Sequence, residues 1–436
     1  MQKFLKVNIK EETKWICGVK LILMMKLVYI HVIGAFVYLP STENLRYYTN
    51  LIDVVYMDLV LNPFETVESF LFLSAFLTLY LRRNNVKHSI FYYIMFAVKR
   101  FIRLTFPVLC ASAIALILPI FCDVPHSQFL QEQVNLIEEN WWKFVFHISN
   151  FYKLEPMIIT HMWIMNVTLQ LNVITVPILF ILDRWPKCGI ITMLLLTLIG
   201  FAANTTILYI TDTATIFGYC LDIKKMMNYY EKVYFKPHCS HLSSYCIGLL
   251  VGYLLSEKKI SEFEKKTRLL FWMMSIACLL LTTFGIHGNM NTVSPNENSI
   301  MLYKIFAPYV WIVAQIWVCI AFTKGHGGIV KSFLSSDIFV RFDCLNVSLY
   351  VVHFFFIFYI ITTIRKPFYL SMLTLWMAFI FVMFVSMIAS FIFYLFLEAP
   401  FNAMFKNVFY KTNSNETSLH KNECQLQTIN KLNQEC

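Results

Sequence analysis

Residues 17–39 read CGVKLILMMKLVYIHVIGAFVYL, an apolar run long enough to cross a bilayer as a helix. Three ionisable side chains lie inside it, those of Lys20, Lys26 and His31. Because ionisable groups are costly in hydrocarbon, they usually face a polar interior. Lys20 and His31 share nearly one helix face and are separated by roughly 16 Å along the axis. The run predicts a membrane helix with a cation near one end and an imidazole about half a membrane away. Snorkelling of Lys20 and simple packing of His31 would explain the same residues.

The rest of the chain has the same apolar character. Hydrophobic residues make up 58% of the 436, and 14% are charged, against about 25% in soluble proteins. Because the apolar runs do not alternate every second residue as barrel strands do, we expect helices. The sequence predicts an all-α, polytopic membrane protein of about ten transmembrane helices. The apolar runs lie at 17–39, 64–80, 104–121, 161–182, 188–210, 242–255, 269–286, 301–323, 345–363 and 370–397.

The distribution of Lys and Arg predicts the orientation. Most of them lie in the first segment and in every second loop after it, so both termini are expected on the cytoplasmic side. Residues 1–16 then form a cytoplasmic N-terminal segment, 17–410 the membrane domain and 411–436 a polar, disordered tail. The first fifteen residues hold no apolar segment of a signal peptide, so the first span is expected to direct insertion. The net charge of +10 suits an anionic inner leaflet rather than a nucleic acid.

The twelve cysteines give no sign of a metal site or a cofactor. They lack CxxC and Cys/His spacing, and most fall in apolar runs, where a thiol usually acts as a small hydrophobe. Cys122, Cys220 and Cys239 lie in expected exterior loops, where two of them could form a disulfide. The sequence does not decide which two. We expect no bound metal and no bound cofactor.

Two acidic residues mark the second span and two arginines precede the third. Glu65 and Glu68 share a helix face, and Glu68 lies deeper, so it needs a partner. His31 is the expected partner, either in a structural salt link or as part of a reacting pair. Arg100 and Arg103 share a face at the expected inner surface. They either anchor the span or bind anionic phosphates.

The later spans contain further polar residues. His161 and Trp163 open the fourth span, and Tyr350 lies one turn before His353 in the ninth. In the sixth span, Gly248 and Gly252 have the small-xxx-small spacing that lets helices approach closely.

In their order along the chain, these segments resemble the integral-membrane acyltransferase 3 family, and within it the animal proteins named for nose resistance to fluoxetine. Lys20 and His31 match a first-span pattern in which a basic residue, usually Arg, precedes a histidine. Glu68 stands where that family has Asp. Any one block is weak, but their shared order over residues 15–405 is specific. The matching segments are ICGVKLILMMKLVYIH, TVESFLFLSAFL, KRFIRLTFP, NWWKFVFHISNF, HMWIMNVTLQ, YFKPHCSHLSSYCIGLLVGY, NVSLYVVH and EAPF.

The chain also departs from the family pattern. Thr168 occupies a position that typically carries an acid, His241 replaces an Arg and Ser244 replaces a Pro. Animal members usually begin with an extracellular cysteine-rich domain behind a signal peptide, and neither is found in this sequence. The chain is therefore expected to be a divergent member, a fragment or an incomplete gene product.

The resemblance implies transfer of an acyl group from acyl-CoA to a hydroxyl on a lipid, glycan or small-molecule acceptor. Histidine is the side chain best suited to take a proton from a hydroxyl near neutral pH. We therefore expect His31 to be the base, oriented by Glu68 or another acid. The plasma membrane or the endoplasmic reticulum is the expected location. The other expected roles are Lys20, Arg100 and Arg103 holding the donor, and His161, Trp163, Tyr350 and His353 contacting substrate.

Two other functions fit the same sequence. A family member that has lost catalysis could take part in lipid or small-molecule transport, and Thr168 favours this reading. An unrelated channel or carrier is the third alternative, although no internal repeat of the kind found in many transporters is recognisable.

Overall fold

The structure is a computed structural model. It describes residues 9–37, 42–52, 54–82, 88–121, 127–152, 157–211, 223–237, 240–288, 297–367 and 369–409. The expected disordered tail at 411–436 and the three loop cysteines, Cys122, Cys220 and Cys239, lie outside these residues.

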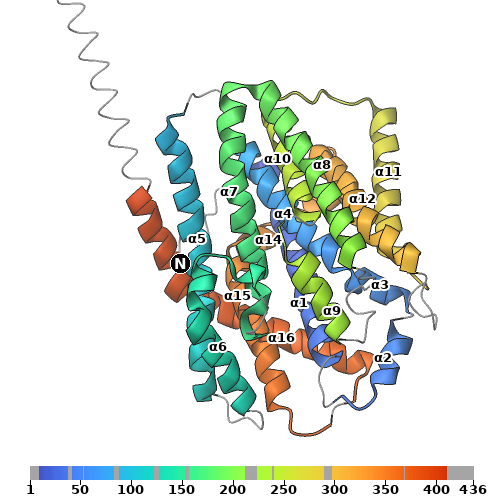
Figure 1. Cartoon of the computed structure of the whole chain (residues 1–436). Helices are drawn as coiled ribbons and strands as arrows, with labels where there is room; N and C mark the ends of the chain where they lie inside the picture. Colours follow the sequence, from blue (N-terminus) through green and yellow to red (C-terminus); the bar gives the residue numbers. More distant parts are fainter. Residues whose placement is uncertain are drawn as a thin grey trace, which may run out of the picture.

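The described chain is built mainly from α-helices, with a few short 3-10 and π-helical segments (Figure 1). The helices are α1 (Trp15–Val37), α2 (Leu45–Leu51), α3 (Val55–Leu61), α4 (Pro63–Tyr80), α5 (Ile90–Ile117), α6 (Ser127–Val145), α7 (Trp163–Arg184), α8 (Pro186–Thr211), α9 (Ile223–Tyr229), α10 (Ser240–Ser256), α11 (Lys265–Phe284), α12 (Glu297–Thr323), α13 (Gly328–Leu334), α14 (Asp337–Phe342), α15 (Asn346–Thr363) and α16 (Met372–Phe393).

Eight helical segments of the described chain are long and apolar enough to cross a membrane. A ninth candidate is the pair α3 and α4, which are bent by 40° at Asn62. The expected sixth span falls on α10, which has 17 residues, slightly fewer than a bilayer usually requires. The prediction of an all-α, polytopic membrane protein is confirmed, and the orientation of the termini stays a prediction.

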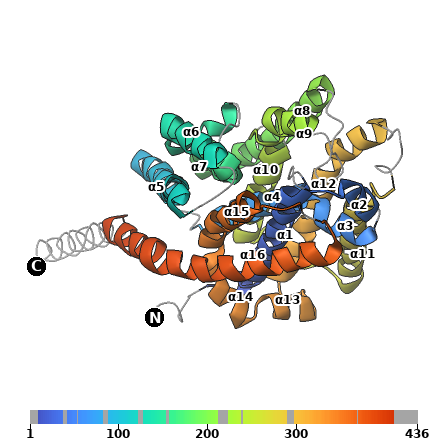
Figure 2. The same cartoon turned by 90° about the horizontal axis from the view of Figure 1, so that it is seen from below.

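Burial distinguishes the central helices from the outer ones. In the segments that contain α1 and α15, 56% and 61% of the span residues are buried, against 17% in α8 and in α11. Viewed from below, α1 and α4 lie near the middle of the molecule (Figure 2). Since exposed apolar side chains on outer helices suit a lipid environment, α8 and α11 form part of the lipid-facing surface.

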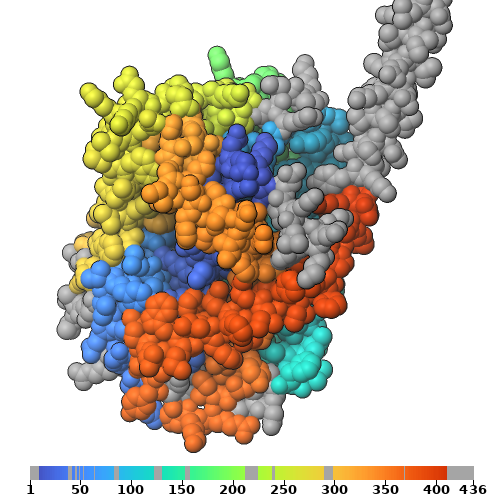
Figure 3. All heavy atoms as spheres, turned by 180° about the vertical axis from the view of Figure 1, so that it is seen from behind, coloured from blue at the N-terminus to red at the C-terminus, as the bar shows by residue number. Residues whose placement is uncertain are grey.

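The last helical segment, 372–409, crosses the back of the molecule obliquely (Figure 3). It consists of α16, a π-helical turn at Tyr394–Glu398 and a continuing helix. The Phe401 ring stacks on the Phe106 ring of α5 with centroids 3.9 Å apart and planes 3° apart. This contact attaches the end of the segment to α5.

Helices α4 and α10 pack backbone against backbone. A Cβ atom on Gly248 would overlap the carbonyl oxygen of Phe72, and one on Gly252 would overlap that of Phe76. The expectation that these two glycines let helices approach closely is therefore confirmed.

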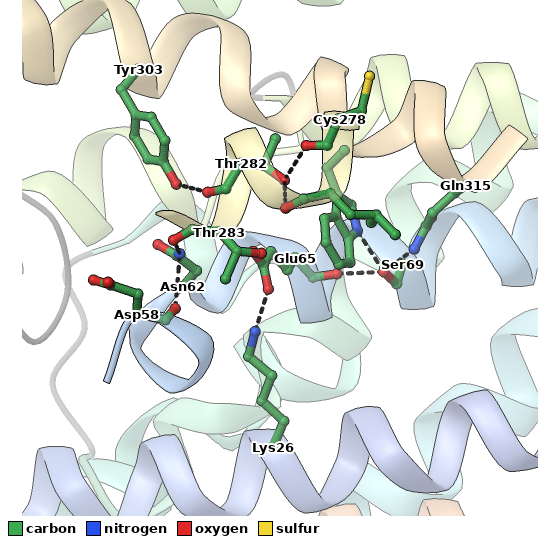
Figure 4. Close-up of polar contacts among 12 residues, drawn as sticks. Lys26, Asp58, Asn62, Glu65, Ser69, Cys278, Thr282, Thr283, Tyr303 and Gln315 are labelled. Carbon is green, nitrogen blue, oxygen red and sulfur yellow. Dashed lines mark hydrogen bonds and ion pairs between the residues drawn. The ribbon is translucent and has the colours of Figure 1, made fainter. Parts of the chain in front are cut away.

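A buried polar network joins α1, α3, α4, α11 and α12 (Figure 4). Lys26 forms an ion pair with Glu65, whose other oxygen accepts a hydrogen bond from the Thr283 hydroxyl at 3.1 Å. Asn62 donates to the backbone oxygens of Asp58 and Thr283. The network satisfies Lys26 and Glu65 inside the helix bundle, as buried charges require.

Candidate functional site

A cavity of about 2000 Å³ lies among α1, α4, α5, α7 and α15. His31 and the two arginines Arg100 and Arg103 line the same cavity, as do His161 and Trp163. None of the residues of the Lys26 network lines it. The sequence segments that were expected to share one polar chamber are thus brought together by the fold.

The cavity has an imidazole end and a basic end. His31 lies in the second half of α1 and His161 just before α7 begins. Lys20 lies near the start of α1, about 16 Å from His31 along the axis. Arg100 donates a hydrogen bond at 2.9 Å to Thr78, which lies near the end of α4. The helix directions therefore place the basic residues together and away from the imidazoles. The charged residues that line the cavity are Lys20, Arg82, Arg100, Arg103, Asp343, Glu398 and Lys406.

His31 is paired with another imidazole. Its Nδ1 lies 2.9 Å from Nε2 of His353, and the two ring planes are 7° apart. His353 is fully buried, and its Nδ1 lies 3.0 Å from the Leu349 carbonyl oxygen. His353 was expected to line the cavity, but it lies behind His31 and is not among the lining residues. Sequence spacing could not show this, because the contact joins residues far apart in the chain.

His161 is held at the cavity by α15. The Tyr350 hydroxyl donates a hydrogen bond to the His161 backbone oxygen, and the His161 ring stacks on Phe354 with centroids 4.7 Å apart. The side chain is buried, with only 3% exposed, and neither ring nitrogen has a hydrogen-bond partner in the described chain. Because an unsatisfied buried polar group costs about 1–3 kcal/mol, His161 is an obvious place for a ligand atom to bind.

Glu68 pairs with a different histidine from the one expected. His241 Nδ1 lies 2.8 Å from Glu68 Oε1, and both side chains are fully buried. The expected pairing of Glu68 with His31 is therefore corrected: His353 is the partner of His31. Neither Glu68 nor His241 lines the cavity, whereas Trp163, whose ring lies 5.6 Å from that of His241, does.

Several of the basic lining residues have acidic or polar partners. Lys20 Nζ lies 3.1 Å from Asp343 Oδ1, and Arg82 forms an ion pair with Asp183. Arg103 is exposed and attracts the Glu398 carboxyl. Sequence reasoning missed Arg82, Lys406 and Asp343 as lining residues. Asp343 could have been suspected, because it is the acid that lies three residues before the NVSLY segment.

Thr168 lines the cavity at the position where the family pattern has an acid. Its hydroxyl donates to the Ile164 carbonyl oxygen of its own helix at 2.6 Å. The hydroxyl is therefore already satisfied and does not replace a carboxylate facing the cavity.

A further histidine fixes the loop beside α5 and α7. His147 is buried, and its ring nitrogens lie 3.0 Å from the Thr105 hydroxyl and 3.0 Å from Asn166 Oδ1. Burial lowers the pKa of His147 to about 4, an effect that the Asn166 hydrogen bond partly opposes. Within the described chain, no group of three or more His, Cys, Asp or Glu residues is placed to hold a metal ion.

The chain is similar to proteins of a known family. Residues 13–395 match the family model described as an acyltransferase domain. The chain is 25% identical over 226 residues to nose resistant to fluoxetine protein 6 of Caenorhabditis elegans, which is 49% of this chain and 27% of the relative. The chain thus matches about a quarter of that relative's length. No solved structure matches the chain.

The family match covers most of the chain, including α1 with His31 and α15 with His353. Together with the multiple apolar helices, it makes this an integral, multi-pass membrane protein. The chain belongs to the integral-membrane acyltransferase 3 family.

Proposed function

We propose that this protein is a membrane-bound O-acyltransferase that moves an acyl group from acyl-CoA to a hydroxyl on a lipid, glycan or small-molecule acceptor. The observation that carries the proposal is the single cavity shared by His31 and the arginines Arg100 and Arg103. Such a cavity can hold a phosphate-rich donor at one end and an acceptor hydroxyl beside an imidazole at the other.

The basic end suits the donor. CoA carries phosphates, and guanidinium groups bind phosphates through paired hydrogen bonds. Arg100 and Arg103 are the main candidates. Lys20, expected to share this role, lines the cavity with its charge balanced by Asp343, so it contributes less net charge to an anion.

The imidazole end suits the chemistry. His31 takes the proton from the acceptor hydroxyl as its oxygen attacks the thioester carbonyl carbon. The new ester bond forms, the carbon–sulfur bond breaks, and the proton passes from His31 to the leaving CoA thiolate. His161, whose ring nitrogens have no hydrogen-bond partner in the described chain, donates to the carbonyl oxygen as negative charge develops on it. Trp163 and Tyr350 bound the same space.

The direct test is release of free CoA by the full chain purified into lipid nanodiscs. Acetyl-CoA and palmitoyl-CoA serve as donors, with a panel of lipid, sugar and small-molecule hydroxyls as acceptors. We expect His31→Ala to abolish transfer and to leave expression intact. The matched control is His326→Ala, which removes a histidine that does not line the cavity. Full activity of His31→Ala would remove His31 from the mechanism.

A second candidate function is transport or uptake of a lipid or small molecule by a family member that has lost catalysis. Thr168 in place of an acid at the cavity wall favours it. The relative in C. elegans is named for resistance to fluoxetine. Absence of CoA binding by the purified protein, together with binding of a small hydrophobic ligand, would support this function over catalysis.

A further inference from the structure

We infer that His353 is a positioning residue that fixes the tautomer of His31, with the proton on Nδ1 and the lone pair on Nε2. The inference deepens the proposed function, because it names the atom of His31 that accepts the hydroxyl proton. It rests on that function only for its kinetic consequence, since the tautomer itself is a property of the unliganded protein.

The first step is the proton on His353. Its Nδ1 lies 3.0 Å from the carbonyl oxygen of Leu349. A carbonyl oxygen only accepts, so Nδ1 must carry a proton to make this hydrogen bond. His353 is fully buried, and its hydrogen bonds in the described chain go to Leu349 and to His31 rather than to a carboxylate. A charged imidazolium there would lack an anionic partner at hydrogen-bond distance. His353 is therefore neutral, and its Nε2 holds a lone pair.

The second step transfers this constraint to His31. The Nε2 lone pair of His353 lies 2.9 Å from Nδ1 of His31. Two lone pairs would repel at that distance, so Nδ1 of His31 carries the proton and donates it. A neutral imidazole has one N–H, which leaves the lone pair on Nε2 of His31. That is the nitrogen a general base needs free.

The ring geometry supports this direction of donation. The ring planes of His31 and His353 are 7° apart and their centroids are 5.1 Å apart. An imidazole N–H lies in the plane of its ring, so two nearly coplanar rings joined edge to edge give a straight hydrogen bond. His31 is partly exposed and lines the cavity. With Nδ1 occupied by His353, Nε2 is the ring nitrogen left to meet a substrate.

Helix α15 supplies the support for both imidazoles at this end of the cavity. His353 holds the His31 ring, and Tyr350, one turn earlier, holds the His161 backbone through its hydroxyl. The two histidines are supported differently, since the His161 ring nitrogens have no hydrogen-bond partner in the described chain. We therefore assign the fixed tautomer to His31 alone.

The test measures the tautomer directly in the full chain. Histidine labelled with ¹⁵N and ¹³C is incorporated, and magic-angle-spinning NMR is recorded on proteoliposomes of phosphatidylcholine at pH 7.5, without substrate. In wild type we expect His31 protonated at Nδ1, and a coupling across the hydrogen bond between His31 Nδ1 and His353 Nε2. His31→Gln, which removes one pair of signals, supplies the assignment. A wild-type His31 protonated at Nε2, or the lack of the ¹⁵N–¹⁵N coupling, overturns the inference.

Two substitutions at the same position separate positioning from packing. In His353→Gln the amide oxygen replaces Nε2 as acceptor, so His31 should keep its proton on Nδ1. In His353→Leu the volume is similar but the acceptor is lost, and the proton on His31 should move to Nε2 in a substantial share of molecules. An unchanged tautomer in a folded His353→Leu protein would contradict the inference.

The kinetic consequence is measured in the CoA-release assay. We expect His353→Leu to lower kcat by roughly 10²-fold or more, with little change in KM for the donor, and His353→Gln to recover much of the loss. Equal losses in both variants would mean that His353 only packs against His31. If His31→Ala keeps full activity, the proposed function fails while the NMR result for the tautomer still stands.

Discussion

Glu68 Oε1 and His241 Nδ1 lie 2.8 Å apart, with both side chains fully buried between α4 and α10. The other ring nitrogen, His241 Nε2, donates to the Tyr234 carbonyl oxygen at 2.7 Å. Since that nitrogen must carry a proton, the 2.8 Å contact holds either a charged imidazolium against a carboxylate or a protonated carboxyl against a neutral imidazole. In both cases one proton lies between the two side chains and each depends on the other.

Removing Glu68 should therefore destabilise the protein. Breaking a buried ion pair by deleting one partner costs roughly 3–5 kcal/mol, so we expect Glu68→Ala to lower Tm strongly in a thermal-shift assay in detergent. Glu68→Gln retains an acceptor oxygen, so its decrease in Tm should be smaller. The control is Glu262→Ala, which breaks an ion pair with Lys324 in an exposed loop, where we expect little change. A Tm for Glu68→Ala equal to that of wild type would contradict the structural role.

Thr168 can be tested as the position of a missing acid. Thr168→Asp places a carboxylate at the cavity wall, and if the chain is a weakened enzyme we expect CoA release to rise by roughly 10²-fold, the lower end of what a placed acid or base contributes. Thr168→Val is the matched control. It should change activity little, because the hydroxyl that it removes is bound to the Ile164 carbonyl of its own helix. A rate for Thr168→Asp no higher than for Thr168→Val would show that no acid is needed at this position.

Substitution of Arg100 or Arg103 should affect binding of the acyl-CoA donor more than the chemical step. Each hydrogen bond from a guanidinium to a phosphate is worth about 1.5 kcal/mol or more. Arg100→Gln and Arg103→Gln should therefore each raise KM for acyl-CoA about tenfold, with a smaller effect on kcat. Arg184→Gln serves as control, because Arg184 packs over the Phe180 ring and does not line the cavity. An unchanged KM in the Arg100→Gln, Arg103→Gln double variant would place the donor elsewhere.

Because His147 is buried, we expect the folded protein to lose stability at acidic pH. Its pKa is lowered by burial from 6.5 to about 4, so in acid the unfolded chain takes up a proton before the folded protein does. The contribution of His147 to the free energy of unfolding is therefore fully present above pH 6.5. It decreases as the pH drops towards 4 and changes no further below that pH. The loss amounts to about 3 kcal/mol at most. Tm measured between pH 8 and pH 4 checks this.

His147→Gln supplies the comparison. Its amide can still bond to Thr105 or Asn166 but does not titrate, so the variant should lose less stability over the same pH range. An identical decrease in both proteins would assign the acid sensitivity to other groups.

The sequence predicted about ten spans, against eight or nine helical segments of sufficient length in the described chain. Most of the predicted runs fall on these segments because each span depends on a continuous apolar run. It also predicted the close contact at Gly248 and Gly252, since small residues at that spacing have one common use. The short apolar run at 242–255 likewise corresponds to a short helix, α10. The break at Asn62 between α3 and α4 was less visible, because hydropathy does not record a bend within an apolar stretch.

The side-chain pairings were harder to predict. The position of a residue in its span indicates its depth in the membrane, which is why the sequence suggested a similar level for His31 and Glu68. Depth does not reveal which helices are neighbours. In the folded protein α15 brings His353 to His31, while α10 brings His241 to Glu68.

The backbone contact at Gly248 and Gly252 has a consequence for how this protein could admit bulky molecules. Because the two backbones touch at these glycines, we expect α4 and α10 to move together as one unit. We then expect any widening needed by a long hydrocarbon tail to occur at another part of the molecule, where α5 meets the oblique C-terminal segment through the stacked rings of Phe106 and Phe401.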